Sequence, residues 1–180
     1  MNRHLRQTML FGLVLILGAA APVRTEKRIP EYLLKAQVIR VLADYVTWPD
    51  QEVTGTAFLA VVGYSPFEEY LETVFKTQDA SGGSQSLCYS KKPALLCDSK
   101  ILFICASESS VLPQILEKVK GKAVLTVSDT PGFAAKGVMI NLSLKEKRPA
   151  FEINVKAVRD AKLRISAHVL KLAQIVDGPT

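Results

Sequence analysis

Histidine is almost missing from this sequence, since its 180 residues contain only His4 and His168. One imidazole beyond the first few residues cannot build a histidine-rich zinc site, and the three cysteines lack the spacing of metal ligands. Gly63 and the pair Gly82-Gly83 lack the repeated glycines of a dinucleotide-binding fingerprint. No activated nucleophile lies near His168 in the sequence, which favours a helix surface residue over a general base. We therefore expect a protein that is not an enzyme and that holds no metal or cofactor.

Basic segments interleaved with aromatic residues are also missing. The formal net charge is +6, and the Lys and Arg residues are scattered along the chain. Proteins that bind single-stranded nucleic acid combine cations with aromatic side chains on which bases stack. The sequence therefore predicts a solvated surface and no nucleic-acid partner.

No segment reaches the length of a membrane-spanning helix. Residues 9–17 form an apolar run that is about half of the roughly 20 residues required. Arg3 and Arg6 precede this run and small residues follow it at 18–21, which is typical of a secretory signal peptide. We expect residues 1–21 to be cleaved after export, in preference to remaining as a membrane anchor. Cleavage lowers the formal charge to +4 and leaves residues 22–180 as a single domain.

The three cysteines all lie after the predicted signal peptide, and an exported protein can form disulfides. Cys105 follows an apolar run and is expected to be a small residue of the core. Cys88 and Cys97 are the better pair, because Pro93 lies between them and allows the loop to fold back. A bridge that closes so short a loop stabilises a fold by about 2 to 3 kcal/mol.

The first predicted element is an amphipathic helix over residues 30–45. Its apolar residues recur at steps of three and four positions and are Leu34, Val38, Val41, Leu42 and Tyr45. Trp48 and Pro49 end the helix, since a residue before proline avoids the helical region.

Apolar runs bounded by turn residues predict strands, with helices between them. The predicted strands are 57–62, 86–89, 101–106, 123–127, 138–144 and 150–155, and the connecting helices are 65–75 and 109–119. Ser65, Pro66 and Glu68 have the order of a capping box at the start of the first connecting helix. Alternating strands and helices require right-handed crossovers. We therefore predict a single α/β domain with a mostly parallel central sheet, helices on both faces, and a C-terminal antiparallel hairpin at the edge.

Polar residues follow the predicted parallel strands. The carboxyl ends of such strands meet at one edge of an open sheet, where ligands bind in this fold class. The candidate ligand residues at this rim are Tyr64, Ser65, Ser107, Glu108, Ser128 and Asp129. Hydroxyl side chains also suit turns and helix caps, so a structural role remains the alternative.

The predicted C-terminal hairpin offers a second candidate surface. Alternation over residues 151–154 buries the first and third side chains and directs the second and fourth to the other face. The candidate partner-binding residues are Glu152, Asn154, Val158 and Trp48. The alternative is that these residues only pack the last helices or, for Trp48, anchor the first helix.

Several of these segments occur in a recognisable order over nearly the whole chain after residue 21. They are Tyr45-Val46-Thr47-Trp48-Pro49, residues 59–63, Cys97-Asp98 before residues 101–104, Ile140-Asn141-Leu142, Phe151-Glu152-Ile153-Asn154, Ala157, Leu163-Arg164-Ile165-Ser166 and Val169-Leu170-Lys171-Leu172-Ala173. This order resembles the YfiR-like family of periplasmic regulators, most closely over residues 137–172.

The resemblance implies a function that composition does not. YfiR-like proteins inhibit an inner-membrane diguanylate cyclase by binding its periplasmic domain, which lowers cyclic di-GMP and biofilm formation, and an outer-membrane lipoprotein sequesters them. A homodimer is also implied. One departure concerns Cys97, which matches a family cysteine whose partner lies on the first strand, where this chain has Ala60. The resemblance therefore leaves Cys88 as the partner of Cys97.

A second hypothesis belongs to another class. It is a periplasmic small-ligand sensor that uses the polar rim and acts with a histidine kinase or a transporter. A third hypothesis, an enzyme, would require Glu108, Asp129 and His168 to share one deep pocket.

Overall fold

A computed structural model describes residues 29–49, 57–75, 86–92, 96–146 and 148–178. The predicted signal peptide lies outside these residues. In chain order the elements are α1 (Glu31–Ala43), β1 (Val46–Thr47), β2 (Ala57–Val62), α2 (Tyr70–Phe75), β3 (Leu87–Ser90), β4 (Ser99–Ile104), η2 (Ala106–Glu108), α3 (Leu112–Val119), β5 (Leu125–Ser128), η3 (Ala134–Lys136), β6 (Ile140–Lys145), β7 (Arg148–Asn154), α4 (Val155–Asp160), β8 (Arg164–Ile165), α5 (Ala167–Leu172) and β9 (Gln174–Val176). None of the helices in the described ranges is long and apolar enough to cross a membrane.

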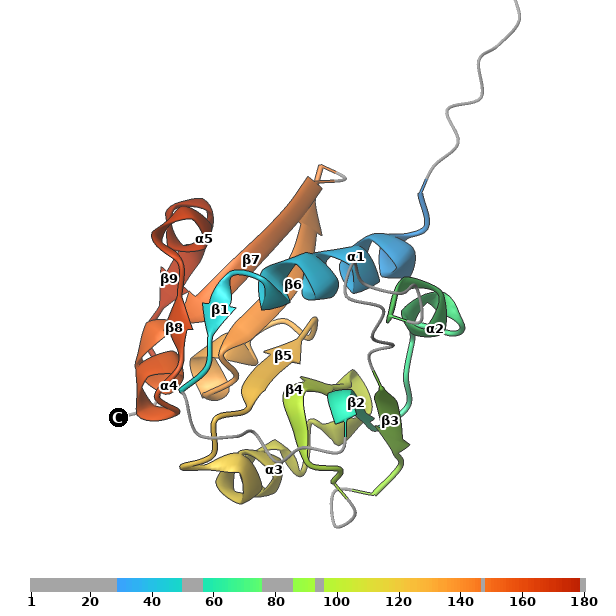
Figure 1. The fold of residues 1–180 in the computed structure, drawn as a ribbon, viewed down its shortest axis with the longest axis horizontal. Helices are drawn as coiled ribbons and strands as arrows, with labels where there is room; N and C mark the ends of the chain where they lie inside the picture. Colours follow the sequence, from blue (N-terminus) through green and yellow to red (C-terminus); the bar gives the residue numbers. More distant parts are fainter. Residues whose placement is uncertain (1–28, 50–56, 76–85, 93–95, 147, 179–180) are drawn as a thin grey trace, which may run out of the picture.

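Seven strands form the central sheet, in the order β3-β2-β4-β5-β6-β7-β9 (Figure 1). The strands from β3 to β6 are parallel, and β7 returns antiparallel to β6. The predicted α/β fold with a mostly parallel sheet and a C-terminal hairpin is confirmed. The structure adds β9 outside the hairpin, parallel to β7, and a separate antiparallel pair of β1 and β8.

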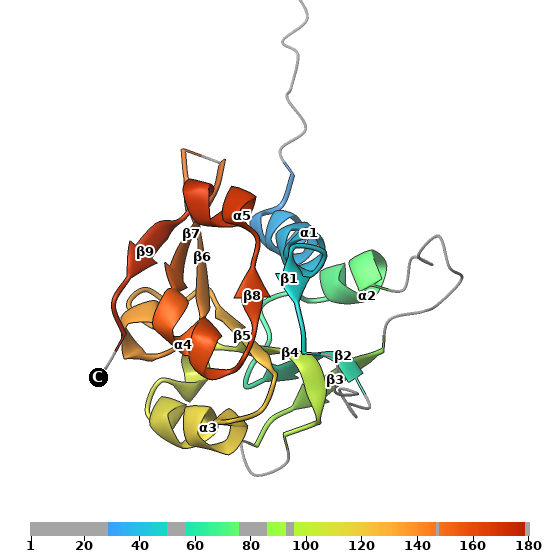
Figure 2. The ribbon, with the colours of Figure 1, turned by 60° about the vertical axis from the view of Figure 1, so that its left-hand side comes forward.

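Alternate residues of the central strands enter two different cores, because successive side chains of a strand point to opposite faces. Leu59 and Phe103 pack with α1, α2, α4 and α5 on one face. Leu102 and Ile104 pack with α3 and with Phe133 near η3 on the other face. Figure 2 shows α1 and α2 on one side of the sheet and α3 on the other. The prediction of helices on both faces is therefore correct.

The face by which α1 enters the core differs from the expected one. Of the five residues expected to form its apolar stripe, only Leu42 is buried, whereas Val41 is 53% exposed and Tyr45 is 44% exposed. The core takes Ala36 and Ile39 instead, together with Ala43. These residues also follow helical spacing, so α1 carries two apolar faces and only one of them enters the core.

The start of α2 also differs from the prediction. The expected capping box does not form, because Glu68 adopts a positive φ of 49° and α2 begins at Tyr70. Ser65 accepts a hydrogen bond from the Phe67 N–H over 3.3 Å, which makes a turn rather than a helix cap. Phe67 is then fully buried, with edge contacts to Tyr32 of α1 and Phe103 of β4 at centroid distances of 5.3 and 4.8 Å.

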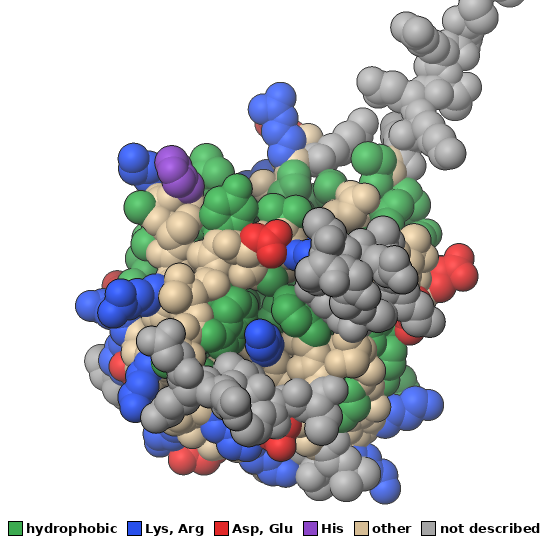
Figure 3. All heavy atoms as spheres, viewed as in Figure 1, with side chains coloured by type: hydrophobic (Ala, Val, Ile, Leu, Met, Phe, Trp, Pro, Cys, Tyr) green, Lys and Arg blue, Asp and Glu red, His purple; other side chains and the backbone are tan. Residues whose placement is uncertain are grey.

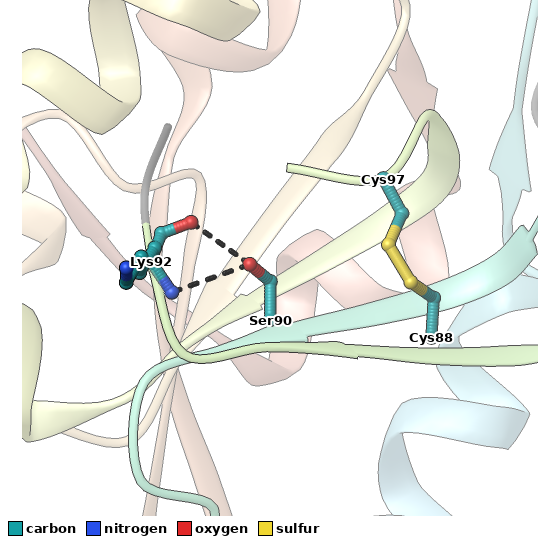
Figure 4. The surroundings of a disulfide bond; sticks show 4 residues. All are labelled: Cys88, Ser90, Lys92 and Cys97. Carbon is teal, nitrogen blue, oxygen red and sulfur yellow. Dashed lines mark hydrogen bonds between the residues drawn. A yellow bond between two sulfur atoms is a disulfide. The ribbon is translucent and has the colours of Figure 1, made fainter. Parts of the chain in front are cut away.

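A disulfide joins Cys88 on β3 to Cys97 in the segment before β4 (Figure 4). The two Cα atoms lie 6.4 Å apart. Ala60, which occupies the position of the family's partner cysteine, is the register neighbour of Cys88 on β2. The bridge therefore starts one strand further out in the sheet. Cys105 is buried with a free thiol, as expected.

We expect the number of reactive thiols to differ among the native protein, the protein unfolded without reductant and the protein unfolded after reduction. Native protein should react with no equivalent of Ellman's reagent, since Cys105 is 1% exposed and the other two are bridged. Unfolding in guanidinium without reductant should release one reactive thiol per chain, and unfolding after reduction should release three. Three thiols in the unreduced, unfolded protein would contradict the disulfide, and rapid reaction of native protein would contradict the burial of Cys105.

Candidate functional site

The ends of β2 and β4 meet closely at the predicted rim. The backbone N–H of Tyr64 donates to Ser107 Oγ over 3.0 Å, and Ser107 Oγ donates to Glu108 Oε1 over 2.9 Å. Gly63 makes this approach possible, because its φ is 100° and a Cβ there would overlap Ser107 Oγ. The three polar rim residues are thus engaged with one another.

The end of β5 joins the same rim through Ser128. Its hydroxyl donates to the carbonyl oxygen of Ile104 over 2.7 Å and accepts from the Thr130 N–H over 3.2 Å. Ser128 is fully buried, so these bonds satisfy a hydroxyl that has no access to water. The serine therefore ties β5 to β4.

Asp129 forms an ion pair with Lys35, which reaches it from α1. Lys35 Nζ lies 2.8 Å from Asp129 Oδ2, and the two side chains are 7% and 8% exposed. Glu31, one turn earlier on α1, contacts the same ammonium group at 2.5 Å. The ammonium group also lies 4.6 Å from the ring centroid of Tyr32. Helix α1 is thereby fastened to the carboxyl end of β5.

Burial and charge act on the protonation of this cluster. Burial favours the neutral form of Lys35, but its hydrogen bonds to Asp129 and Glu31 outweigh burial, so the pKa of Lys35 is raised. Burial, followed by the nearby Asp129 charge, also raises the pKa of Tyr32. Burial, assisted by Asp129 and Glu108, raises the pKa of the Cys105 thiol to about 12. All three groups keep their protons at neutral pH.

The six rim residues follow the ends of β2, β4 and β5, which are neighbours in the sheet. Polar atoms of Ser107, Ser128 and Asp129 bind neighbouring strands and α1, whereas the Tyr64 side chain is 77% exposed. Ligand binding at the rim stays a prediction. The rim does not include His168, which lies on α5 and lines a separate groove without Glu108 or Asp129.

The predicted partner-binding residues fall into two groups. Asn154 and Val158 are only 1% and 4% exposed, and Asn154 caps α4 by accepting from the Ala157 N–H over 2.9 Å. These two side chains therefore have structural contacts within the domain, and their role in partner binding stays a prediction. Glu152 is half-buried on β7, and Trp48 is half-buried after β1 with Lys100 Nζ 6.0 Å from its ring centroid. Glu152 and Trp48 remain predicted contact residues.

An apolar groove lies between α1 and α5, with β7 as its floor. It encloses about 720 Å³. Its apolar lining includes Leu34, Val38, Val41 and Tyr45 of α1, Phe151 of β7 and Leu172 of α5. Figure 3 shows hydrophobic side chains gathered at the top of this face, where these elements meet. The volume falls in the range of small-molecule and peptide sites, about 300 to 1,000 Å³.

The sequence interpretation named five of these groove residues, four as the apolar face of the first helix and Phe151 as a buried strand position. It did not identify Pro149, His168 or Leu172 as part of a surface site. The sequence pattern that could have revealed the groove is a double apolar stripe on α1. Residues 36, 39 and 43 repeat with helical spacing, and so do residues 34, 38, 41 and 45. A helix with two such stripes has one more apolar face than a core-packing helix needs.

The fold and the two sites define a mixed α/β domain that presents a closed polar cluster and an open apolar groove. A family model described as YfiR/HmsC-like matches residues 32–174, and the chain therefore belongs to this family. Proteins of this family are periplasmic regulators rather than enzymes. The family resemblance drawn from the sequence motifs is confirmed.

A solved structure supports the fold independently. The chain is similar to the crystal structure of a conserved domain protein from Vibrio cholerae O1 biovar El Tor str. N16961, with a TM-score of 0.55 and 14% sequence identity. The similarity covers 82% of this chain and 60% of the Vibrio chain, so the protein spans less than two thirds of that structure. A comparison with curated proteins found no match.

We expect Lys35→Met to destabilise the fold by about 3 to 5 kcal/mol, because it leaves the Asp129 carboxylate buried without its partner. The matched control is Lys120→Met, which breaks a pair with Glu117 whose side chains are 72% and 70% exposed and should cost less than about 1 kcal/mol. Urea unfolding of both variants gives the comparison. The double variant Lys35→Met/Asp129→Leu should regain most of the loss. Equal effects of the two single changes would contradict a structural role for the buried pair.

Stability should fall at alkaline pH. The pKa of Cys105 rises from 9.0 to about 12 on folding, so its contribution is complete below pH 9 and is lost as the pH approaches 12. Lys35 has a raised pKa as well, so its contribution has the same sign and is lost above its ordinary value of 10.5. The free energy of unfolding, measured with urea at several pH values, should decrease from pH 9 upward. The Cys105→Ala variant should show a weaker decrease between pH 9 and pH 10.5, and an unchanged slope would contradict the role of the thiol.

Proposed function

We propose that this protein is exported to the periplasm and inhibits an inner-membrane diguanylate cyclase by binding the periplasmic domain of that enzyme. Inhibition lowers cyclic di-GMP and thereby limits biofilm formation. The observation that carries the proposal is the match to the YfiR/HmsC-like family over residues 32–174, which includes every strand of the central sheet except the last two residues of β9. An outer-membrane lipoprotein that sequesters the protein, and a homodimer, belong to the same proposal.

The geometry supports a protein that acts by binding. The largest exposed apolar side chains include Val41, Tyr45 and Leu172, and all three line the apolar groove. Continuous exposed apolar surface of this kind marks sites of protein or ligand binding. Glu152 and Trp48 lie outside the groove lining and offer further polar and aromatic contacts.

Such inhibition works through differential affinity for two states of the cyclase. A regulator shifts an equilibrium only by the ratio of its affinities for the two states. Moving the cyclase from 99% active to 99% inactive needs a ratio of about 10⁴. The regulator must therefore distinguish two arrangements of the cyclase's periplasmic domain, and a rigid surface suits that task better than a mobile loop. The groove is built on two helices and the central sheet, with Val169 and Leu42 buried beneath it.

The structure gives less support to the alternative of a small-ligand sensor at the polar rim. The hydrogen-bonding atoms of Ser107, Ser128 and Asp129 are engaged with neighbouring strands and with α1. A polar ligand there would have to compete with these bonds, including a buried ion pair. The sensor hypothesis is therefore the second candidate and not the first.

The test is deletion of the gene in its native host, with cellular cyclic di-GMP measured by mass spectrometry. Deletion should raise cyclic di-GMP several-fold. A plasmid copy with residues 1–21 should restore the low level, whereas a copy that starts at residue 22 should not, because it stays on the wrong side of the membrane. Unchanged cyclic di-GMP after deletion would refute inhibition of a cyclase, and full restoration by the shortened copy would refute export.

A further inference from the structure

The groove runs along three turns of α1. Its α1 residues, from Leu34 to Tyr45, repeat at positions i, i+4, i+7 and i+11. At 1.5 Å per residue this stripe is about 16 Å long, which equals three turns of a second helix. The groove therefore has the length that helix-in-groove recognition uses, in which a partner helix inserts apolar side chains at similar spacing.

Most of the core contacts of α1 do not come from this stripe, in which Val38 packs only partly against the core. The opposite face of α1 supplies the fully buried contacts, through Ala36 and Ile39. Val41 remains 53% exposed and Leu172 on the facing helix remains 77% exposed. Exposed side chains of this size on both walls gain stability only when another surface covers them.

Charges around the groove are asymmetric. On the α1 wall, Arg40 pairs with Asp44 over 2.9 Å, so that wall is internally neutralised. On the facing side, Lys171 of α5 and Arg148 of β7 are exposed and have no carboxylate partner among the described residues. Lys171 is the chain neighbour of the groove residue Leu172 on α5, whereas Arg148 alternates with the groove residues Pro149 and Phe151 along β7 and starts from the opposite face of the strand. Figure 3 shows Lys and Arg side chains at the borders of the apolar area.

We propose that the apolar groove is the docking site for an amphipathic helix of about three turns whose apolar face is flanked by acidic residues. The apolar face covers Val38, Val41 and Phe151, and the acidic flank lies against Lys171. This inference deepens the proposed function and rests on it only for the identity of the protein that carries the helix. A second copy of this chain fits less well, since its own Lys171 would approach the same cation across a two-fold axis. A flat membrane surface covers a concave groove less completely than a helix does.

Site-specific photocrosslinking in the native host tests the occupant. The probe p-benzoylphenylalanine is placed at Val41 in the full chain, and at Gln114 on α3 as the control, which is exposed on the opposite side of the sheet. Irradiation should give an adduct from position 41 and none from position 114. Mass spectrometry of the adduct should map it to a segment with apolar residues at i, i+3 or i+4, and i+7 and with an excess of Asp and Glu.

The acidic flank is tested by charge reversal in the protein that carries the probe. The change Lys171→Glu should lower the adduct yield at least two-fold, because it places a like charge against the helix. The matched control is Lys91→Glu, which reverses an exposed cation beside β3 at the far edge of the sheet and should leave the yield unchanged. The thermal midpoints of both charge variants should stay within a few degrees of the parent, which separates lost docking from lost folding.

Each of the remaining outcomes contradicts one part of the docking proposal or of the proposed function. An adduct with a second copy of this chain would assign the groove to a homodimer, and an adduct with lipid would assign it to the membrane. An equal yield from both charge variants would refute the acidic flank. Absence of any adduct at position 41, in cells where gene deletion raises cyclic di-GMP, would refute docking in the groove while the proposed function stands. An acidic helical adduct in cells where deletion changes nothing would support docking and refute the cyclase.

Discussion

The arrangement of this domain depends on one buried ion pair, between Lys35 of α1 and Asp129 at the end of β5. A buried pair contributes little net stability compared with apolar residues of similar size, yet the loss of one partner is costly. The ion pair instead constrains the position of α1, because the helix must lie where the Lys35 ammonium group reaches the Asp129 carboxylate. That position closes the polar rim and sets α1 over the first core. It also presents the second apolar face of α1 to solvent.

Helix α1 therefore serves the core and the surface at the same time. Ala36 and Ile39 pack inward against the sheet, whereas Val41 and Tyr45 form one wall of the apolar groove. Because both faces belong to one rigid helix, a change in how α1 sits on the sheet moves the groove wall as well. The ion pair at Asp129 and the groove are thus mechanically connected through about three turns of helix.

Much of the fold was predictable from local pattern. The continuous apolar runs identified β2, β4 and β5, and the order of strands and helices required parallel crossovers. The start of α2 was not predictable in this way, because Ser65, Pro66 and Glu68 satisfy a capping pattern that the burial of Phe67 overrides. The candidate site was only partly predictable. The rim residues lie together as expected, since the carboxyl ends of neighbouring parallel strands meet at one edge of the sheet. The hydrogen bonds of Lys35, Tyr64 and Ser128 within the rim were not predictable, because they join residues 24 to 94 positions apart.

The sequence by itself determined the class of fold, the family and the pairing of the cysteines, since each depends on residue order and on short-range pattern. Tertiary structure alone decided which apolar face of α1 is buried, because the helix carries two apolar stripes, and the buried one lies on the side of Lys35, which pairs with Asp129. It also decided that Asn154 and Val158 are buried and that His168 and Leu172 face α1 across a groove. The physical reason is that burial is a property of neighbours that are distant in the chain, and local periodicity does not contain them.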